Sequence, residues 1–218
     1  MPLSKQKKQI HENKFHDMLG CWIESFLTPL DVYGYCSITL VNIDSVHNEL
    51  SRQKNQKAVA DTIIRIAKKF LLNQNSGETI NSSLKELSSV IQAEHIYILS
   101  VDEKTFSTKY EWNMNGIPSC RKKFQNIARS YLRALKHDDL PEGQKKDFTF
   151  ESLESIKKAD SELYEFIIST GIRNVVQVPL KKDGEIIGYI GACNFAEKHD
   201  KEIKRILSEV SVFFASQM

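Results

Sequence analysis

The chain has no long apolar run, and its first residues are polar and rich in lysine. A helix needs about 20 mainly apolar residues to cross a bilayer, so we expect no membrane span and no membrane partner. A secretory signal needs a shorter apolar core, which the first residues also lack. These absences predict a cytoplasmic protein.

Charge of one sign and clustered cysteines are also missing. Charged residues make up 27% of the chain, but both signs alternate and the net charge is only +2, so we expect no nucleic-acid partner. The four cysteines are Cys21, Cys36, Cys120 and Cys193. None lie at two-residue spacing and no histidine pair is close to them, so the sequence predicts free thiols and no metal site.

Catalytic motifs are absent as well. There is no Gly-rich phosphate loop, no His-Glu-x-x-His and no Gly-x-Ser-x-Gly. The histidines at 95, 137 and 199 are scattered, and we expect them at surface or packing positions rather than as ligands. The sequence therefore predicts a protein that is not an enzyme.

What is present begins with a hydrophobic content of 41% over 218 residues, enough for a sizeable core. Residues 1–14 have no apolar period and are expected to be disordered. Residues 15–44 read as a strand, a turn and a second strand, which form a β-hairpin. Residues 45–78 form a long linker helix and its end, with apolar residues spaced by threes and fours up to position 72.

The pattern of residues 79–218 alternates between helical and strand periods. The expected order is a helix, two strands, a helix over 121–135, a short strand over 147–150, a helix over 155–169, a hairpin and a terminal helix over 198–217. Antiparallel hairpins flanked by helices indicate an α+β fold with helices packed on one face of the sheet.

Local signals are strongest between positions 167 and 195. A helix ends at Gly171, the next strand ends in Pro179-Leu180, an Asp183-Gly184 turn follows, and the last strand contains Gly188 and Gly191. Glycine ends helices at C′, proline avoids positions that need a ladder hydrogen bond, and strand glycines leave room for another element. This stretch resembles the last two strands of GAF domains.

The GAF resemblance covers residues 79–218 and implies a sensory module that binds a small molecule or has a purely structural role. It also implies a homodimer formed through the terminal helices, here 45–72 and 198–217. Some GAF domains reduce methionine sulfoxide, attach a bilin or bind a cyclic nucleotide. The surroundings of Cys120 and Cys193, and the residues after Asn194-Phe195, lack the patterns of those groups.

The family's pocket lies between the sheet and the segment equivalent to residues 121–150. The resemblance implies that aromatic side chains line it and that an arginine could meet an anionic ligand; these residues are Tyr97, Trp112, Phe124, Tyr131, Phe148 and Arg121. The alternative is that the aromatic side chains fill the pocket and no ligand binds. The sequence identifies neither the ligand nor a cofactor.

Residues 15–44 are similar to the last two strands of PAS domains. Trp22, a Pro29 turn and the Asn42-Ile43-Asp44 triplet before a helix carry the similarity. A degenerate diguanylate cyclase fragment is the alternative, and its catalytic signature is absent. A PAS tail followed by a helix and a GAF domain resembles bacterial signalling proteins that end in a diguanylate cyclase or kinase, so we expect a truncated product or a fragment.

These observations lead to one functional prediction with two alternatives. The predicted function is that of a non-enzymatic sensory GAF-like domain of a bacterial signal-transduction protein that controls an output domain through ligand binding, dimerisation or both. Its alternatives are a purely structural dimerisation module with a filled pocket, and the sensor fragment of a diguanylate cyclase.

Overall fold

The computed structural model describes residues 9–32, 35–72, 76–128, 153, 157–158 and 161–218. The chain divides into two compact units, Met1–Lys57 and Ala58–Met218, which are described separately. Among the described helices, none combines the length and the apolar character needed to cross a membrane.

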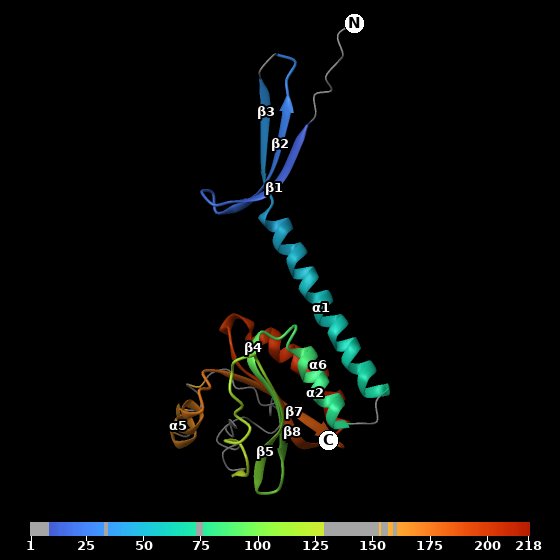
Figure 1. Ribbon diagram of the computed structural model, residues 1–218, viewed down its shortest axis with the longest axis vertical. Helices are drawn as coiled ribbons and strands as arrows, with labels where there is room; N and C mark the ends of the chain where they lie inside the picture. Colours follow the sequence, from blue (N-terminus) through green and yellow to red (C-terminus); the bar gives the residue numbers. More distant parts are fainter. Residues whose placement is uncertain (1–8, 33–34, 73–75, 129–152, 154–156, 159–160) are drawn as a thin grey trace. The chain divides into compact units, whose positions relative to one another are not determined.

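The first unit contains a three-stranded antiparallel sheet rather than the expected hairpin (Figure 1). Strands β1 (Ile10–His16), β2 (Cys21–Pro29) and β3 (Cys36–Asn42) lie in chain order. The prediction of disorder for residues 1–14 is wrong for residues 10–14, which belong to β1. Residues 1–8 lie outside the described part of the chain. Strand β1 is mostly polar, but it pairs along its whole length with β2, and His11 stacks on Phe26 with ring centroids 4.7 Å apart.

Helix α1 (Asp44–Leu72) begins directly after β3, as the sequence predicted. The Trp22 backbone N–H donates a 2.8 Å hydrogen bond to Asp44 Oδ1, and the Trp22 ring stacks on His47 at 4.1 Å. Asn42 Oδ1 accepts from the Asp44 N–H at 2.9 Å. The residues that suggested a PAS tail thus fix the start of α1, while the PAS relationship itself stays a prediction.

The second unit is built on a five-stranded antiparallel sheet with the order β6-β5-β4-β8-β7. Its strands are β4 (Ala93–Val101), β5 (Thr105–Asn113), β6 (Ile127–Ala128), β7 (Val175–Lys182) and β8 (Glu185–Phe195). Helices α2 (Ser76–Leu87), α5 (Ser161–Ser169) and α6 (Asp200–Ala215) complete the described elements, with a short 3-10 turn, Glu197–His199, before α6. The predicted α+β fold is confirmed.

The main core lies between one face of this sheet and helices α2 and α6 (Figure 1). Ile96 and Ile98 of β4 and Ile190 of β8 point into it and are fully buried. The second half of α1 joins the same core, where the Phe70 ring meets the Phe214 ring edge-on at 5.1 Å. A single apolar layer therefore connects the sheet to three helices.

Turn chemistry between β7 and β8 follows the sequence closely. Asp183 and Gly184 both have positive φ, 52° and 85°, as a type I′ hairpin requires. Gly171 ends α5 with a φ of 87°. Pro179 lies in β7, which is an edge strand, so its missing N–H removes no bond within the sheet.

The predicted helix over 121–135 is wrong for residues 121–128. These residues form turns and then β6, which pairs with the outer edge of β5. Asn126 has a φ of 55°, which no α-helix allows. The apolar spacing of Phe124 and Ile127 reflects contact with the sheet rather than a helical face. Residues 129–135 and the predicted strand over 147–150 lie outside the described residues.

One ion-pair cluster links α1 to α2. The carboxylate of Glu86 lies 2.7 Å from Lys69 Nζ and 3.1 Å from Arg65 Nε. Burial by itself would raise the pKa of Glu86, but the hydrogen bonds from Lys69 and Arg65 lower it below its ordinary value. The ionised carboxylate therefore stabilises the fold at pH values above its ordinary pKa of 4.5, and this contribution is lost as the pH falls through the lower folded pKa.

We expect Glu86→Gln to lower the free energy of unfolding by about 1 kcal/mol near neutral pH. The difference in the free energy of unfolding between the variant and wild type should shrink in acid, because wild-type Glu86 is then protonated and neutral, as glutamine is at every pH. Urea unfolding at neutral and acidic pH measures both effects, and Glu162→Gln, at an exposed carboxylate of α5, is the control. An equal deficit at both pH values would contradict the assignment.

Candidate functional site

A β-bulge decides which side chains of β5 face away from the helices. Thr108 pairs with Leu99 and Tyr110 with Ile98, so Lys109 is an extra residue in the ladder. Strict alternation would place Phe106, Thr108, Tyr110 and Trp112 on one face. Because of the bulge, Tyr110 and Trp112 pack against the helix-covered core, whereas Phe106 packs with Leu99 on the opposite face. Glu111 thereby joins the face that α2 and α6 leave uncovered.

An aromatic bridge occupies the centre of this second face. Tyr97 of β4 is paired with Gly191 of β8, which is paired in turn with Gln177 of β7. The Tyr97 hydroxyl group donates a 3.1 Å hydrogen bond to Gln177 Oε1. A Cβ added to Gly191 would lie 2.5 Å from the Tyr97 hydroxyl oxygen and 2.9 Å from Cε2. The tyrosine ring therefore crosses over Gly191, in the space where a side chain would otherwise stand.

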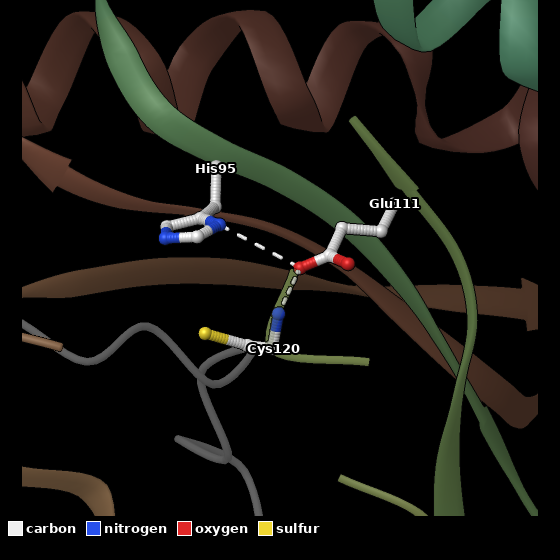
Figure 2. A group of neighbouring side chains, drawn as sticks. All are labelled: His95, Glu111 and Cys120. Atoms are coloured by element: carbon white, nitrogen blue, oxygen red, sulfur yellow. Dashed lines mark hydrogen bonds and ion pairs between the residues drawn. The ribbon is translucent and has the colours of Figure 1, made fainter. Parts of the chain in front are cut away.

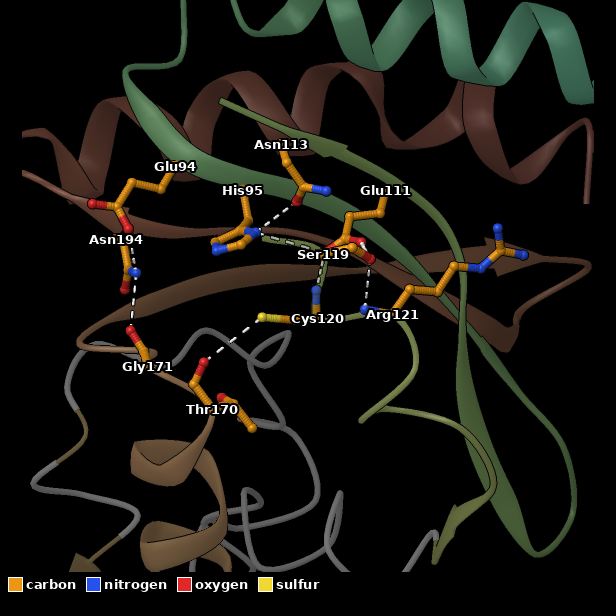
Figure 3. A network of polar contacts seen from close by, with 10 residues as sticks. All are labelled: Glu94, His95, Glu111, Asn113, Ser119, Cys120, Arg121, Thr170, Gly171 and Asn194. Carbon is orange, nitrogen blue, oxygen red and sulfur yellow. Dashed lines mark hydrogen bonds and ion pairs between the residues drawn. The ribbon is translucent and has the colours of Figure 1, made fainter. Parts of the chain in front are cut away.

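A polar cluster lies next to the tyrosine, on the outer half of the sheet (Figure 3). His95 Nδ1 lies 2.7 Å from Asn113 Oδ1 and 3.6 Å from Glu111 Oε1. Glu111 also accepts hydrogen bonds from the Cys120 backbone N–H, at 3.0 Å, and from the Ser119 hydroxyl group. The side chains of His95 and Glu111 are only 7% and 6% exposed. Glu111 thus ties the loop after β5 to the sheet.

The hydrogen bonds of this cluster shift its pKa values. Burial opposes ionisation of Glu111, but the nearby His95 and the hydrogen bonds from Ser119 and the Cys120 N–H lower its pKa to about 2. The nearby Glu111 carboxylate raises the pKa of His95 against the effect of burial. Burial and the Glu111 charge raise the pKa of the Cys120 thiol, and burial raises that of Cys193. Neither thiol is poised as a nucleophile by itself.

A second polar group closes the end of the same face, where β4, β8 and α5 meet (Figure 3). Asn194 Oδ1 accepts from the Arg173 backbone N–H at 2.7 Å. Its Nδ2 donates to Glu94 Oε2 at 2.6 Å and to the Gly171 carbonyl oxygen at 3.1 Å. The Arg173 guanidinium lies 2.6 Å from Glu94 Oε1. Asn194 therefore holds the end of α5 against two strands.

The structure brings together only some of the residues predicted to line a pocket. Tyr97 and Phe124 share one apolar cluster with residues of α5 on the second face, where Phe124 meets Phe166 edge-on at 5.3 Å. Arg121 lies in the adjoining loop, and its Nε donates to the Thr108 carbonyl oxygen at 3.3 Å. Trp112 lies on the helix-covered face, away from this group. Tyr131 and Phe148 lie outside the described residues.

Nothing in the sequence indicated the polar cluster. His95 was expected at a surface or packing position, and Glu111 and Cys120 are widely separated from it along the chain. Only the bulge at Lys109 brings Glu111 to the side of His95. A period-two pattern contains no signal for an extra residue, so no reading of β5 alone could have found this arrangement.

Comparison with known proteins gives matches at the level of structure alone. No protein-family model matches the chain, and no curated protein sequence matches it. The GAF domain of a phosphoenolpyruvate-protein phosphotransferase from Coxiella burnetii matches with a TM-score of 0.53 and 10% identity, over 74% of this chain and 92% of that chain. The phycocyanobilin-bound GAF domain of a cyanobacterial phytochrome matches with a TM-score of 0.52 and 13% identity, over 73% and 94%.

The fold is of the GAF type. The chromophore-binding domain of a bacteriophytochrome from R. palustris also matches, with a TM-score of 0.52 and 14% identity, over 95% of this chain and 72% of that chain. In the GAF fold of this chain, one sheet face is committed to the helical core, and the other carries Tyr97, Phe124 and the polar cluster. The second face is therefore the candidate functional site.

Proposed function

We propose that this chain is a non-enzymatic sensory or regulatory GAF domain of a bacterial signal-transduction protein, which binds a small molecule and controls a partner or output domain. The observation that carries the proposal is the layered contact from the candidate site to α1. Tyr97 lies over Gly191 on one face of β8, while the neighbouring Ile190 and Ala192 pack on the other face in the core that contains Phe214 and Phe70.

This arrangement supports transmission by displacement of packed layers. Protein interiors are close-packed, so a shift of Tyr97 or β8 has no free volume to absorb it. The core on the far side of β8 includes Val59, Ile66 and Phe70 of α1. A ligand that favours one position of the sheet would thereby bias the position of α1.

The exposed face of α1 supports dimerisation with a second copy of the chain. Residues of α1 follow a four-three spacing along one stripe, whose members are Val46, Leu50, Gln53, Lys57, Ala60, Ile64, Ala67 and Leu71. The large apolar members are exposed, with Ile64 at 52% and Leu71 at 83%, while Val59, Ile66 and Phe70 face the core. This spacing is that of a coiled-coil seam. Helix α6 adds the exposed Val212 as a further apolar contact.

Ligand binding is tested by mass spectrometry of the natively purified chain, followed by thermal-shift measurements against a metabolite library. We expect a bound molecule, and stabilisation that rises with its concentration. Phe124→Ala should weaken binding by at least about tenfold, whereas Tyr110→Phe, on the other face, should not. If no compound binds and the face is filled by its own side chains, the chain is the purely structural dimerisation module instead.

Dimerisation is tested by analytical ultracentrifugation of the full chain. We expect Ile64→Glu to weaken self-association by at least about tenfold, because it places two like charges in a closed apolar seam. Gln56→Glu adds the same charge to α1 outside the seam and should leave the dimer intact. A wild-type monomer, or an Ile64→Glu variant that associates normally, would refute this interface.

A further inference from the structure

Three kinds of donor atom, a nitrogen, an oxygen and a sulfur, converge at one place in the polar cluster (Figure 2). His95 comes from β4, Glu111 from β5 and Cys120 from the loop that follows. One ligating atom of each residue lies within 4.8 Å of the other two. His95 is buried and Glu111 is 6% exposed, so two of the donors are held within the fold.

The distances suit ligands of one ion better than partners of each other. His95 Nδ1 and Glu111 Oε1 are 3.6 Å apart, which is too long for a good direct hydrogen bond. Zinc binds nitrogen, oxygen and sulfur at about 2.0 to 2.3 Å in a tetrahedral shell, so two ligand atoms on one zinc ion lie roughly 3.3 to 3.8 Å apart. The histidine and the carboxylate already have this separation.

Cys120, the third donor, needs only a small movement to complete the site. Cys120 is only partly buried and lies in a loop, and its thiol makes a long 3.8 Å contact with the Thr170 carbonyl oxygen. A movement of about 1 Å would bring the sulfur to zinc-ligand distance from the other two donors. The amide oxygen of Asn113, 2.7 Å from His95 Nδ1, lies at the edge of the same space.

We propose that His95, Glu111 and Cys120 bind a zinc ion, with a fourth position open to water. Imidazole, carboxylate and thiolate together exclude Mg²⁺ and Ca²⁺, which require oxygen ligands, and suit zinc. On binding, the Cys120 thiol and the imidazole lose protons to solvent, and the two anionic ligands balance the charge of the ion. The site does not depend on the small-molecule sensing proposed above.

The ion would join β4, β5 and the loop after β5, a role that the hydrogen bonds of Glu111 already serve in part. Because the Ser119 hydroxyl group donates to Glu111 Oε2, the outer shell that orients the carboxylate is in place. Metal binding is thus expected to stabilise this loop rather than to rearrange the sheet.

The test is a titration of the metal-free full chain with Zn²⁺, and with Co²⁺ as a spectroscopic probe. We expect one Zn²⁺ per chain to remain after gel filtration, and a higher melting temperature with Zn²⁺. Co²⁺ should give the near-ultraviolet charge-transfer band of a thiolate ligand and the visible bands of a tetrahedral ion. Elemental analysis and absorption spectra measure these outcomes.

Cys120→Ser should abolish the charge-transfer band and weaken Zn²⁺ binding by at least about 100-fold. Glu111→Gln should weaken binding while keeping the band, and circular dichroism checks that both variants fold. Cys36→Ser, at an exposed cysteine of the first unit, should behave as wild type. Absence of stoichiometric Zn²⁺ in wild type, or a band that persists in folded Cys120→Ser, would overturn the proposal.

Discussion

Gly191→Ala is expected to lower the free energy of unfolding by about 3 kcal/mol, at the upper end of the cost of overpacking a well-packed core. The added methyl group would lie 2.5 Å from the Tyr97 hydroxyl oxygen and 2.9 Å from Cε2. To escape this overlap the ring must leave Gly191, which breaks the 3.1 Å hydrogen bond to Gln177. Gln177 is only 4% exposed and would lose a buried partner. Urea unfolding measures the loss.

A double-mutant cycle identifies Tyr97 as the cause. Tyr97→Leu removes the overlapping end of the ring, so Gly191→Ala should cost less than about 1 kcal/mol in that background. Gly188→Ala is the matched contrast, because its Cβ would overlap the Leu99 backbone carbonyl oxygen. No side-chain change can relieve that overlap. If Tyr97→Leu leaves the cost of Gly191→Ala unchanged, overlap with the Tyr97 ring is not the cause of that cost.

Asn194→Ala is expected to be destabilising by a similar amount, about 3 kcal/mol. The substitution removes the acceptor of the Arg173 N–H and the donor to both Glu94 and the Gly171 carbonyl oxygen, in a residue that is 8% exposed. Unpaired groups at a buried site cost about 1 to 3 kcal/mol. Asn194 also has a φ of 57°, which alanine adopts less readily than asparagine or glycine.

Asn194→Gly separates the two causes, because glycine tolerates the positive φ but makes none of the side-chain hydrogen bonds. We expect its free energy of unfolding to lie between those of wild type and Asn194→Ala, about 1 kcal/mol above the latter. Chemical denaturation of the three proteins gives both differences. Equal stability of the alanine and glycine variants would show that the backbone conformation costs nothing. A glycine variant as stable as wild type would show that the side-chain hydrogen bonds of Asn194 do not stabilise the fold.

The candidate site was only partly predictable. Tyr97 and Phe124 were named through the resemblance to GAF domains, and the structure places them in the same apolar cluster although Phe124 lies in a turn rather than in the predicted helix. Trp112 was assigned to the same pocket through that resemblance, whereas the bulge at Lys109 places it against the helical core. The polar cluster escaped notice for the same reason, since Glu111 reaches His95 only after that extra residue.

The sequence by itself determined the elements whose signals are local. Gly171, Asp183 and Gly184 set the end of α5 and the β7–β8 hairpin through backbone conformations that depend on a few adjacent residues. The apolar period of α1 similarly predicted a helix up to Leu72. Such features need no distant partner, so they can be read from the chain.

Only the tertiary structure decided which residues meet across strands. Strand β1 is mostly polar and exists because β2 supplies its hydrogen bonds. Residues 121–128 have the spacing of a helix but form turns followed by β6, which pairs with the edge of β5. Gly188 and Gly191 predicted room for another element against the sheet; at Gly191 that room is taken by Tyr97 of the adjacent strand. Register and bulges depend on contacts between distant segments, and these contacts have no local sequence signal.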